Sequence, residues 1–248
     1  MNFLDFAANS IKPQHKSSFV TAIIVAAGKS VRMGIGKSKQ FIPLCGIAAI
    51  ARTLSAFEKS RLVREVVIVT NRFDIMKVGS VVKEFGFDKV KHIVIGGETR
   101  QQSAALGFNA ISKETEFVAV HDGARPLITS SFIDKAIESA FENGAAALAV
   151  RVKDTVKIAD KNGVVISTPD RQSLWAVQTP QVFGVDIYRA ALEKAQRENK
   201  DYTDDCQLVE ASGGRVQLVE GDYTNIKITT KDDILQAEAI LRARGDAF

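Results

Sequence analysis

The sequence predicts an α/β protein: a doubly wound, mostly parallel sheet with a protruding β-hairpin arm. Short, continuous apolar runs, of the kind that strands buried on both faces require, are the first sign of the sheet. The second sign is that stretches with helical spacing of apolar residues separate these runs. A break in the alternation after Val152 indicates the arm.

Five strands and four intervening helices are expected in this order. The strands cover residues 20–27, 65–70, 91–95, 116–121 and 145–152. The helices cover residues 47–59, 73–85, 99–111 and 131–141, the last with Ser130 or Ser131 as its N-cap. In sheets of this class ligands bind beyond the carboxyl ends of the strands. We therefore expect the loops after Ala27, Ile95 and His121 to share one crevice.

The arm is expected at residues 152–172. Two short strands, 155–159 and 164–168, flank the hairpin turn signal Asp-Lys-Asn-Gly. A projecting hairpin leaves strand edges exposed, and pairing with another subunit is a common way to cover them, so we expect a homodimer. The chain then continues with a helix at 185–197, short strands at 215–219 and 225–228, and a closing helix at 231–244.

Composition places the chain among folded globular proteins. Its 248 residues include 46% hydrophobic and 25% charged residues, which excludes disordered and collagen-like classes, and no linker divides residues 19–248. No apolar run approaches the roughly 20 residues that cross a bilayer. Residues 1–18 lack the basic start and apolar core of a secretory signal, so we expect a leader on a cytoplasmic protein. Cys45 and Cys206 are expected to be buried free thiols.

Positive charge is concentrated near the first expected strand, although the net charge is only +4. No Asp or Glu occurs from Phe6 to Phe57. Within that window the loop after the strand begins Ala26-Ala27-Gly28 and carries Lys29, Arg32, Lys37 and Lys39. Small residues allow close approach of the backbone, and unneutralised cations attract phosphate. A solvated basic loop is the alternative; we favour phosphate binding, although neither the Walker nor the dinucleotide motif matches.

Two further segments and one isolated lysine are candidate site residues. His121-Asp122-Gly123-Ala124-Arg125-Pro126 ends the fourth strand, where Asp122 could hold magnesium or a sugar hydroxyl and Arg125 a phosphate, or the two could pair with each other. We interpret His121 as a packed strand residue. Gly96-Gly97-Glu98-Thr99-Arg100 leads into a helix that bears Ser103, which suits either a bound base or a plain helix cap. Lys227, between two isoleucines, points either into a site or to water.

Together these segments resemble the 2-C-methyl-D-erythritol 4-phosphate cytidylyltransferase family of the non-mevalonate isoprenoid pathway, whose fold is like that of nucleotide-diphosphosugar transferases. The resemblance runs from about Val20 to the C-terminus. The family motif Ala-Ala-Gly-x-Gly-x-Arg-Met, followed by Pro-Lys-Gln, is matched by Ala26, Ala27, Gly28, Arg32, Met33, Lys39 and Gln40. Ser30 stands where Gly is usual, Ser38 where Pro is usual, and Glu98 where Asp is frequent. The other matches are Gly96–Ser103, Val120–Pro126, Asp154-Thr155, Asp170-Arg171, Trp175–Gln181, Thr203-Asp204 and Asn225–Thr229.

The resemblance implies roles for particular residues. The CTP-binding set would be Ala26, Ala27, Gly28, Gly97, Glu98, Ser103, Asp122 and Ala124. The catalytic set would be Arg32, Lys39, Arg171 and Lys227. The set that binds the methylerythritol phosphate would be Arg125, Thr155, Arg171, Thr179 and Lys227, with Thr155 and Arg171 reaching the site from the partner's arm. Magnesium is the implied cofactor; its ligands are left unassigned, with Asp122 a candidate. No second enzyme is expected after the closing helix.

The chemistry fits this interpretation. The substrate's own phosphate attacks the α-phosphorus of CTP, so no activated Ser, Cys or His is needed. Fixed cations and magnesium then neutralise charge in the transition state. Ribitol-5-phosphate cytidylyltransferase is the nearest alternative, but Ala26, Ala27, Ala124 and Trp175 resemble the methylerythritol branch more closely. A non-catalytic nucleotide-binding protein is the alternative of another class. A nucleic-acid partner is disfavoured, because the 7% of aromatic residues are scattered.

Overall fold

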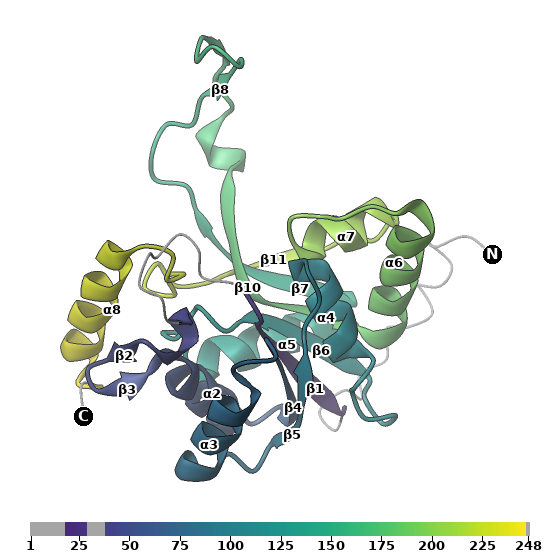
Figure 1. The fold of residues 1–248 in the computed structure, drawn as a ribbon. Helices are drawn as coiled ribbons and strands as arrows, with labels where there is room; N and C mark the ends of the chain where they lie inside the picture. Colours follow the sequence, from purple (N-terminus) through teal and green to yellow (C-terminus); the bar gives the residue numbers. More distant parts are fainter. Residues whose placement is uncertain (1–17, 29–37, 247–248) are drawn as a thin grey trace.

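A seven-stranded sheet forms the centre of the computed structural model, which describes residues 18–28 and 38–246 (Figure 1). The strands are β1 (Val20–Ala26), β4 (Val63–Thr70), β5 (Val90–Ile95), β6 (Phe117–Asp122), β7 (Ala145–Arg151), β10 (Trp175–Gly184) and β11 (Gln217–Glu220). Their order is β11-β7-β10-β6-β1-β4-β5. Neighbours are parallel except that β10 runs antiparallel to both β6 and β7. The predicted α/β class and mostly parallel sheet are therefore confirmed.

Helices cover both faces of the sheet, as the doubly wound prediction requires. One apolar cluster contains residues of α2 (Ala49–Lys59), α3 (Ile75–Phe85) and α5 (Ser130–Asn143). A second contains residues of α4 (Arg100–Phe108), α6 (Val185–Glu198) and α7 (Asp205–Ala211). The alternation of β1 shows why: Ala22 and Ile24 pack in the first cluster, whereas Ile23 packs in the second. Because successive strand residues face opposite sides, both faces must be apolar.

A third apolar cluster joins the C-terminal helix to the rest of the protein. Helix α8 (Lys231–Arg244) packs beside the small hairpin of β2 (Pro43–Leu44) and β3 (Ile47–Ala48), with Leu44, Ile228 and Leu241 buried between them. The strand expected at 225–228 is absent from this described region, so that prediction is wrong. The backbone N–H of Ile228 donates to the Ala124 carbonyl in the loop after β6. Residues 225–228 therefore lie along this loop rather than in the sheet, and we call them the strap.

The expected hairpin extends away from the body of the molecule (Figure 1). Its strands are β8 (Ile158–Ala159) and β9 (Val165–Ser167), shorter than predicted, and the 3-10 turn η4 (Arg171–Ser173) follows. Asp160 Oδ1 accepts hydrogen bonds from the backbone N–H groups of Asn162 and Val164, which fixes the turn. Val164 and Ile166 are about two-thirds exposed, at 63% and 67%. Dimerisation through residues 152–172 stays a prediction.

Among the helices and strands of the described residues, the β2–β3 hairpin, α7 and β10 were not expected from the sequence. Strand β10 contains Pro180, and a proline inside a run argues against a central strand. Its register shifts between Val177 and Gln181, and this irregularity accommodates the proline within the sheet. Cys206 is buried as expected, whereas Cys45 is only partly buried. Apart from Ser18, the expected leader at 1–18 lies outside the described residues.

No helix in the described part of the chain combines the length and the apolar character needed to cross a membrane.

Candidate active site

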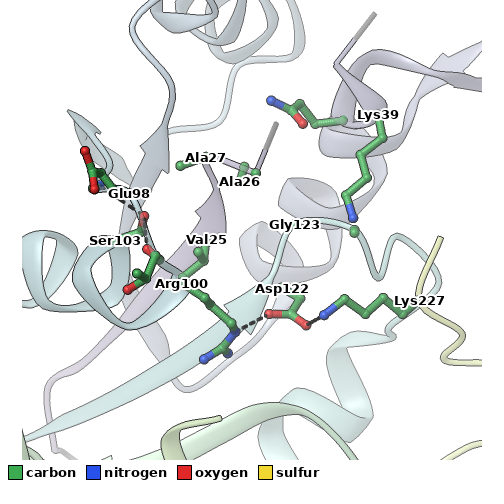
Figure 2. A pocket seen from close by; sticks show the side chains of 15 residues that line it. Val25, Ala26, Ala27, Lys39, Glu98, Arg100, Ser103, Asp122, Gly123 and Lys227 are labelled. Carbon is green, nitrogen blue, oxygen red and sulfur yellow. Dashed lines mark hydrogen bonds and ion pairs between the residues drawn. The ribbon is translucent and has the colours of Figure 1, made fainter. Parts of the chain in front are cut away.

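The loops after β1, β5 and β6 enclose one cavity of about 290 Å³ at the carboxyl ends of the strands (Figure 2). This confirms the prediction that the three loops share a crevice. The cavity is lined by Val25, Ala26, Ala27, Gly28, Lys39, Gln40, Gly97, Glu98, Thr99, Arg100, Ser103, Asp122, Gly123, Ala124 and Lys227. Every member of the CTP-binding set inferred from the sequence lines this cavity.

The wall between β1 and α4 is built by close backbone packing. A Cβ on Gly96 would lie 2.5 Å from Ala27 Cβ and 2.7 Å from Ser103 Oγ, so only glycine fits there. Ser103 Oγ accepts a hydrogen bond from the Gly97 N–H at 3.1 Å and donates one to the Thr99 carbonyl at 2.9 Å. Thr99 and Gln102 form a capping box at the start of α4. Ser103 therefore shapes the loop that carries Gly97 and Glu98.

Asp122 is the electrostatic centre of the crevice (Figure 2). Its Oδ1 lies 2.9 Å from Arg100 Nε, and its Oδ2 lies 2.6 Å from Lys227 Nζ. Burial alone would raise the pKa of Asp122, but the charges of Arg100 and Lys227 outweigh burial and hold that pKa well below its usual range. Asp122 is therefore an ionised carboxylate bound by two cations. The alternative of a side-chain pair between Asp122 and Arg125 is wrong.

Arg100 extends this network behind the crevice, and the sequence analysis did not assign it a role. Its Nη1 lies 2.6 Å from Asp205 Oδ2, and the Tyr188 hydroxyl donates to Asp205 Oδ1 at 2.6 Å. Burial would lower the pKa of Arg100, but Asp205 and Asp122 raise it above its usual value. Burial, followed by the charge of Asp205, raises the pKa of Tyr188. The guanidinium is thereby fixed between two carboxylates from different elements.

A chain of three hydrogen bonds sets the proton positions behind Asp122. The Arg125 carbonyl, 3.2 Å from His121 Nε2, can only accept, so Nε2 carries the proton. Burial lowers the pKa of His121 to about 3, so the ring is neutral and Nδ1 is the acceptor. The Thr179 hydroxyl donates to Nδ1 at 3.0 Å and accepts from the Asp122 N–H at 3.1 Å. These contacts agree with the interpretation of His121 as a packed strand residue.

Two further predicted cations, Arg125 and Lys39, hold backbone carbonyls of the strap at 225–228. Arg125 Nη1 donates to the Asn225 carbonyl at 2.7 Å, and Lys39 Nζ donates to the Ile228 carbonyl at 3.3 Å. Burial lowers the pKa of Arg125. Arg125 and Thr179 lie behind the cavity, whereas Lys39 and Lys227 line it.

Comparison with known proteins identifies the family. The model of the 2-C-methyl-D-erythritol 4-phosphate cytidylyltransferase family matches residues 20–243.

The chain belongs to this family.

Relatives that carry the family name are similar to the chain over almost its full length. The enzyme from Caldanaerobacter subterraneus subsp. tengcongensis is 44% identical over 90% of this chain and 99% of the relative. That from Alkaliphilus metalliredigens is 43% identical over 93% and 96%. Among solved structures, the 4-diphosphocytidyl-2C-methyl-D-erythritol synthase from Anaerococcus prevotii superposes with a TM-score of 0.82 at 33% identity, covering 91% of this chain and 96% of that one.

Two residues that the cytidylyltransferase family implies for the substrate lie on the arm, outside the crevice lining. Thr155 and Arg171 are exposed, and Arg171 Nη1 donates to the Lys153 carbonyl at 3.1 Å. Arg32, which the family implies for catalysis, lies outside the described residues. The structure therefore brings together Lys39 and Lys227 of the four-residue catalytic set.

The crevice offers carboxylates for a magnesium ion of the kind that cytidylyltransferases are expected to use. Glu98 and Asp122 line it, and the depressed pKa of Asp122 keeps that group ionised. Within residues 18–28 and 38–246, no group of three or more His, Cys, Asp or Glu side chains could hold a metal. Mg²⁺ is usually bound by one or two carboxylates together with substrate phosphates and water. Asp122 is the candidate ligand, and it would bind the ion through the lone pairs that its bonds to Arg100 and Lys227 leave over.

Proposed function

We propose that this protein transfers the CMP group of CTP to 2-C-methyl-D-erythritol 4-phosphate (MEP) and releases pyrophosphate, a step in isoprenoid precursor biosynthesis. Family membership across residues 20–243 supports the substrate pair. The observation that carries the chemistry is the crevice at the carboxyl ends of the strands: Lys39, Lys227 and Arg100 line it, and the last two bind the ionised carboxylate of Asp122. Such a site attracts polyanions and holds their charges in fixed positions.

The reaction needs charge neutralisation rather than a protein nucleophile. An oxygen of the MEP phosphate forms a bond to the α-phosphorus of CTP, and the bond from that phosphorus to the bridging oxygen of pyrophosphate breaks. Negative charge then accumulates on the oxygens around phosphorus, where Lys39 and Arg32 stabilise it. Lys227 positions the attacking phosphate, and Asp122 fixes the Lys227 ammonium at 2.6 Å.

The wall next to α4 binds the nucleoside. Gly97 and Glu98 read the cytosine edge, and Ala26, Ala27 and Gly28 line the base and ribose, with Asp122 and Ala124 completing the CTP site. Ser103 contributes through the loop, because its hydroxyl is already bonded to the Gly97 N–H and the Thr99 carbonyl. Arg125 and Thr179 contribute to the MEP side from behind the crevice.

A homodimer would complete the MEP site. Thr155 and Arg171 are exposed on the arm, so in this proposal they reach the crevice of a partner subunit. Magnesium, held by Asp122 and the phosphates of CTP, would neutralise charge on the triphosphate when bound. We expect the enzyme to act in the cytoplasm.

Pyrophosphate release tests the proposal. The purified protein, CTP and magnesium should release pyrophosphate with MEP and much less with ribitol 5-phosphate. Preferential turnover of ribitol 5-phosphate would assign the sister activity. Tight CTP binding with no pyrophosphate released from any polyol phosphate would indicate a nucleotide-binding protein without catalysis.

A further inference from the structure

Asp74 lies outside the cavity lining, yet it binds both residues that flank Lys39. Asp74 Oδ2 accepts a hydrogen bond from Ser38 Oγ at 2.5 Å and from Gln40 Nε2 at 2.9 Å. The Asn71 side-chain amide donates to the same oxygen. Three neutral donors thus converge on one carboxylate oxygen, which is 34 to 36 residues away from the two loop residues in sequence. We call this arrangement the Asp74 clamp.

The clamp is anchored on rigid structure. Asp74 is 6% exposed and is the N-cap residue of α3, and its carbonyl accepts from the Val78 N–H at 2.9 Å. Asn71 Oδ1 accepts from the backbone N–H groups of Phe73 and Asp74, which fixes the turn that follows β4. Because β4 is paired with β1 along its full length, the carboxylate is tied to the central sheet.

The residues it holds form a single tight turn around Lys39. The 3-10 turn η3 (Lys39–Phe41) begins after Ser38, and the Phe41 N–H donates to the Ser38 carbonyl at 3.0 Å. Gln40 is 2% exposed. With one neighbour buried and both neighbours bonded to Asp74, the backbone of Lys39 has a fixed orientation, and its side chain extends along the crevice wall (Figure 2).

Ser38 has a backbone conformation that proline also adopts. Its φ is −62° and its ψ is 127°, and a proline ring fixes φ near −65°. A ring at this position would restrict the backbone covalently, whereas here the bond from Ser38 Oγ to Asp74 restricts it through the side chain.

We infer that Asp74 and Ser38 are positioning residues for phosphoryl transfer: the clamp holds the turn that aims the Lys39 ammonium at the reacting phosphates. This inference rests on the proposed function for its kinetic part. Its structural part, the restraint of residues 38–42, holds whatever the reaction is.

Four variants separate positioning from mere support. Ser38→Ala removes one donor and should lower kcat about tenfold with little change in the KM for CTP, since hydrogen bonds to charged groups are worth about that factor. Asp74→Ala removes the acceptor for all three donors and should lower kcat about a hundredfold. Asp74→Asn keeps one acceptor oxygen and should retain most of the activity. Ser38→Pro should keep kcat within about twofold of the unmodified protein, because the ring supplies the same φ.

Hydrogen–deuterium exchange of residues 39–42 supplies a readout independent of turnover. The amides of Phe41 and Ile42 should exchange faster in Ser38→Ala and Asp74→Ala, and at the unmodified rate in Ser38→Pro. Ser80→Ala is the matched control, since Ser80 Oγ bonds only the Met76 carbonyl of the same helix. Melting temperatures identify any variant that has lost its fold. If Asp74→Ala is unfolded, the comparison of Ser38→Ala with Ser38→Pro decides the test.

Several results would overturn the inference. Unchanged kcat and exchange in Ser38→Ala would mean that the clamp restrains nothing. Equal losses in Ser38→Pro and Ser38→Ala, or in Asp74→Asn and Asp74→Ala, would show that backbone restraint and the acceptor oxygen are not the cause. An unmodified protein without turnover would disprove the proposed function instead, and the exchange rates would still decide whether the clamp exists.

Discussion

The crevice and the arm present their proposed site residues in opposite ways. In the crevice, Asp122 is 7% exposed and its carboxylate binds side chains from α4 and from the strap before α8. On the arm, Thr155 and Arg171 are exposed, and the only side-chain bond given by Arg171 among the described residues goes to a carbonyl of the arm itself. The crevice residues are therefore held within one chain, whereas the proposed arm residues would need a partner subunit to reach a crevice.

This difference shows what each region requires. A network of buried charges holds its geometry within one chain, because breaking any pair would leave an uncompensated charge. The exposed hairpin carries apolar Val164 and Ile166, and such a surface favours contact with a second subunit. Crevice variants should therefore affect the chemistry and the fold, whereas arm variants should affect substrate binding and association.

Removal of Lys39 should have the largest effect. In Lys39→Ala the transition state loses a fixed cation, so kcat should fall by roughly 10²–10³ while the affinity for CTP changes little. The Arg32→Ala variant should behave in the same way. Steady-state kinetics and CTP titration measure both quantities, with Lys83→Ala on the exposed face of α3 as the control. Near-normal turnover in both loop variants would contradict the assignment of the crevice.

Neutralising Asp122 should destabilise the crevice itself. In Asp122→Asn, Arg100 loses one of its two carboxylate partners and Lys227 loses its ion pair. The free energy of unfolding should therefore fall by about 3 kcal/mol. Urea unfolding at neutral pH measures this loss. Lys200→Ala, which breaks an exposed ion pair with Glu198, is the comparison and should change stability much less, because water screens surface charges. Equal losses in the two variants would remove the distinction between buried and exposed pairs.

His121 should make the stability of the crevice depend on pH. Its pKa is about 3 in the folded protein against 6.5 in the unfolded chain, so between these values the unfolded chain binds more protons. The contribution of His121 is complete above pH 6.5 and is lost as the pH falls toward 3, with a slope of about 1.4 kcal/mol per pH unit. Unfolding free energies measured from pH 4 to 8 should show this slope, and His121→Gln should reduce it. An identical slope in the variant would exclude His121 as the source.

Arg171 on the arm should affect the binding of MEP rather than that of CTP. Arg171→Ala should raise the KM for MEP about tenfold, the size of one charge-assisted contact, with a smaller effect on kcat. If two subunits share each site, mixing equal amounts of Arg171→Ala and Arg32→Ala subunits should restore up to about a quarter of the activity at MEP concentrations below KM, because about half of the dimers are mixed and one of the two sites in each is intact. No recovery on mixing would contradict sharing.

The smallest expected effect lies at the tip of the arm. Val165→Asp replaces a side chain that is 54% exposed, so the free energy of unfolding of one subunit should change by no more than about 0.5 kcal/mol. Self-association, measured by analytical ultracentrifugation, should weaken at the same time. A large loss of subunit stability would show that the arm packs within its own chain.

Local sequence patterns were sufficient to predict those elements and loops for which a single signal, such as an apolar run, is decisive. The apolar runs predicted β1 and β6, and the convergence of their carboxyl ends placed Ala27, Asp122 and Gly97 in one crevice. The predictions failed where a local signal opposed the structure that the segment adopts in the folded chain. Pro180 concealed β10, and Ile226 and Ile228 suggested a strand although their segment is a strap held by Arg125 and Lys39.

The sequence by itself determined the sheet class, the acid-free loop and the set of residues at the strand ends, because these depend on periodicity and on neighbours along the chain. Only the tertiary structure decided which charges meet. Arg100 binds both Asp122 and Asp205, and Asp205 lies 105 residues after Arg100 in the sequence. Asp74, at the start of α3, binds the distant Ser38. Ion pairs and hydrogen bonds act over a few ångströms, and no local pattern records which distant segments the folded sheet brings within that range.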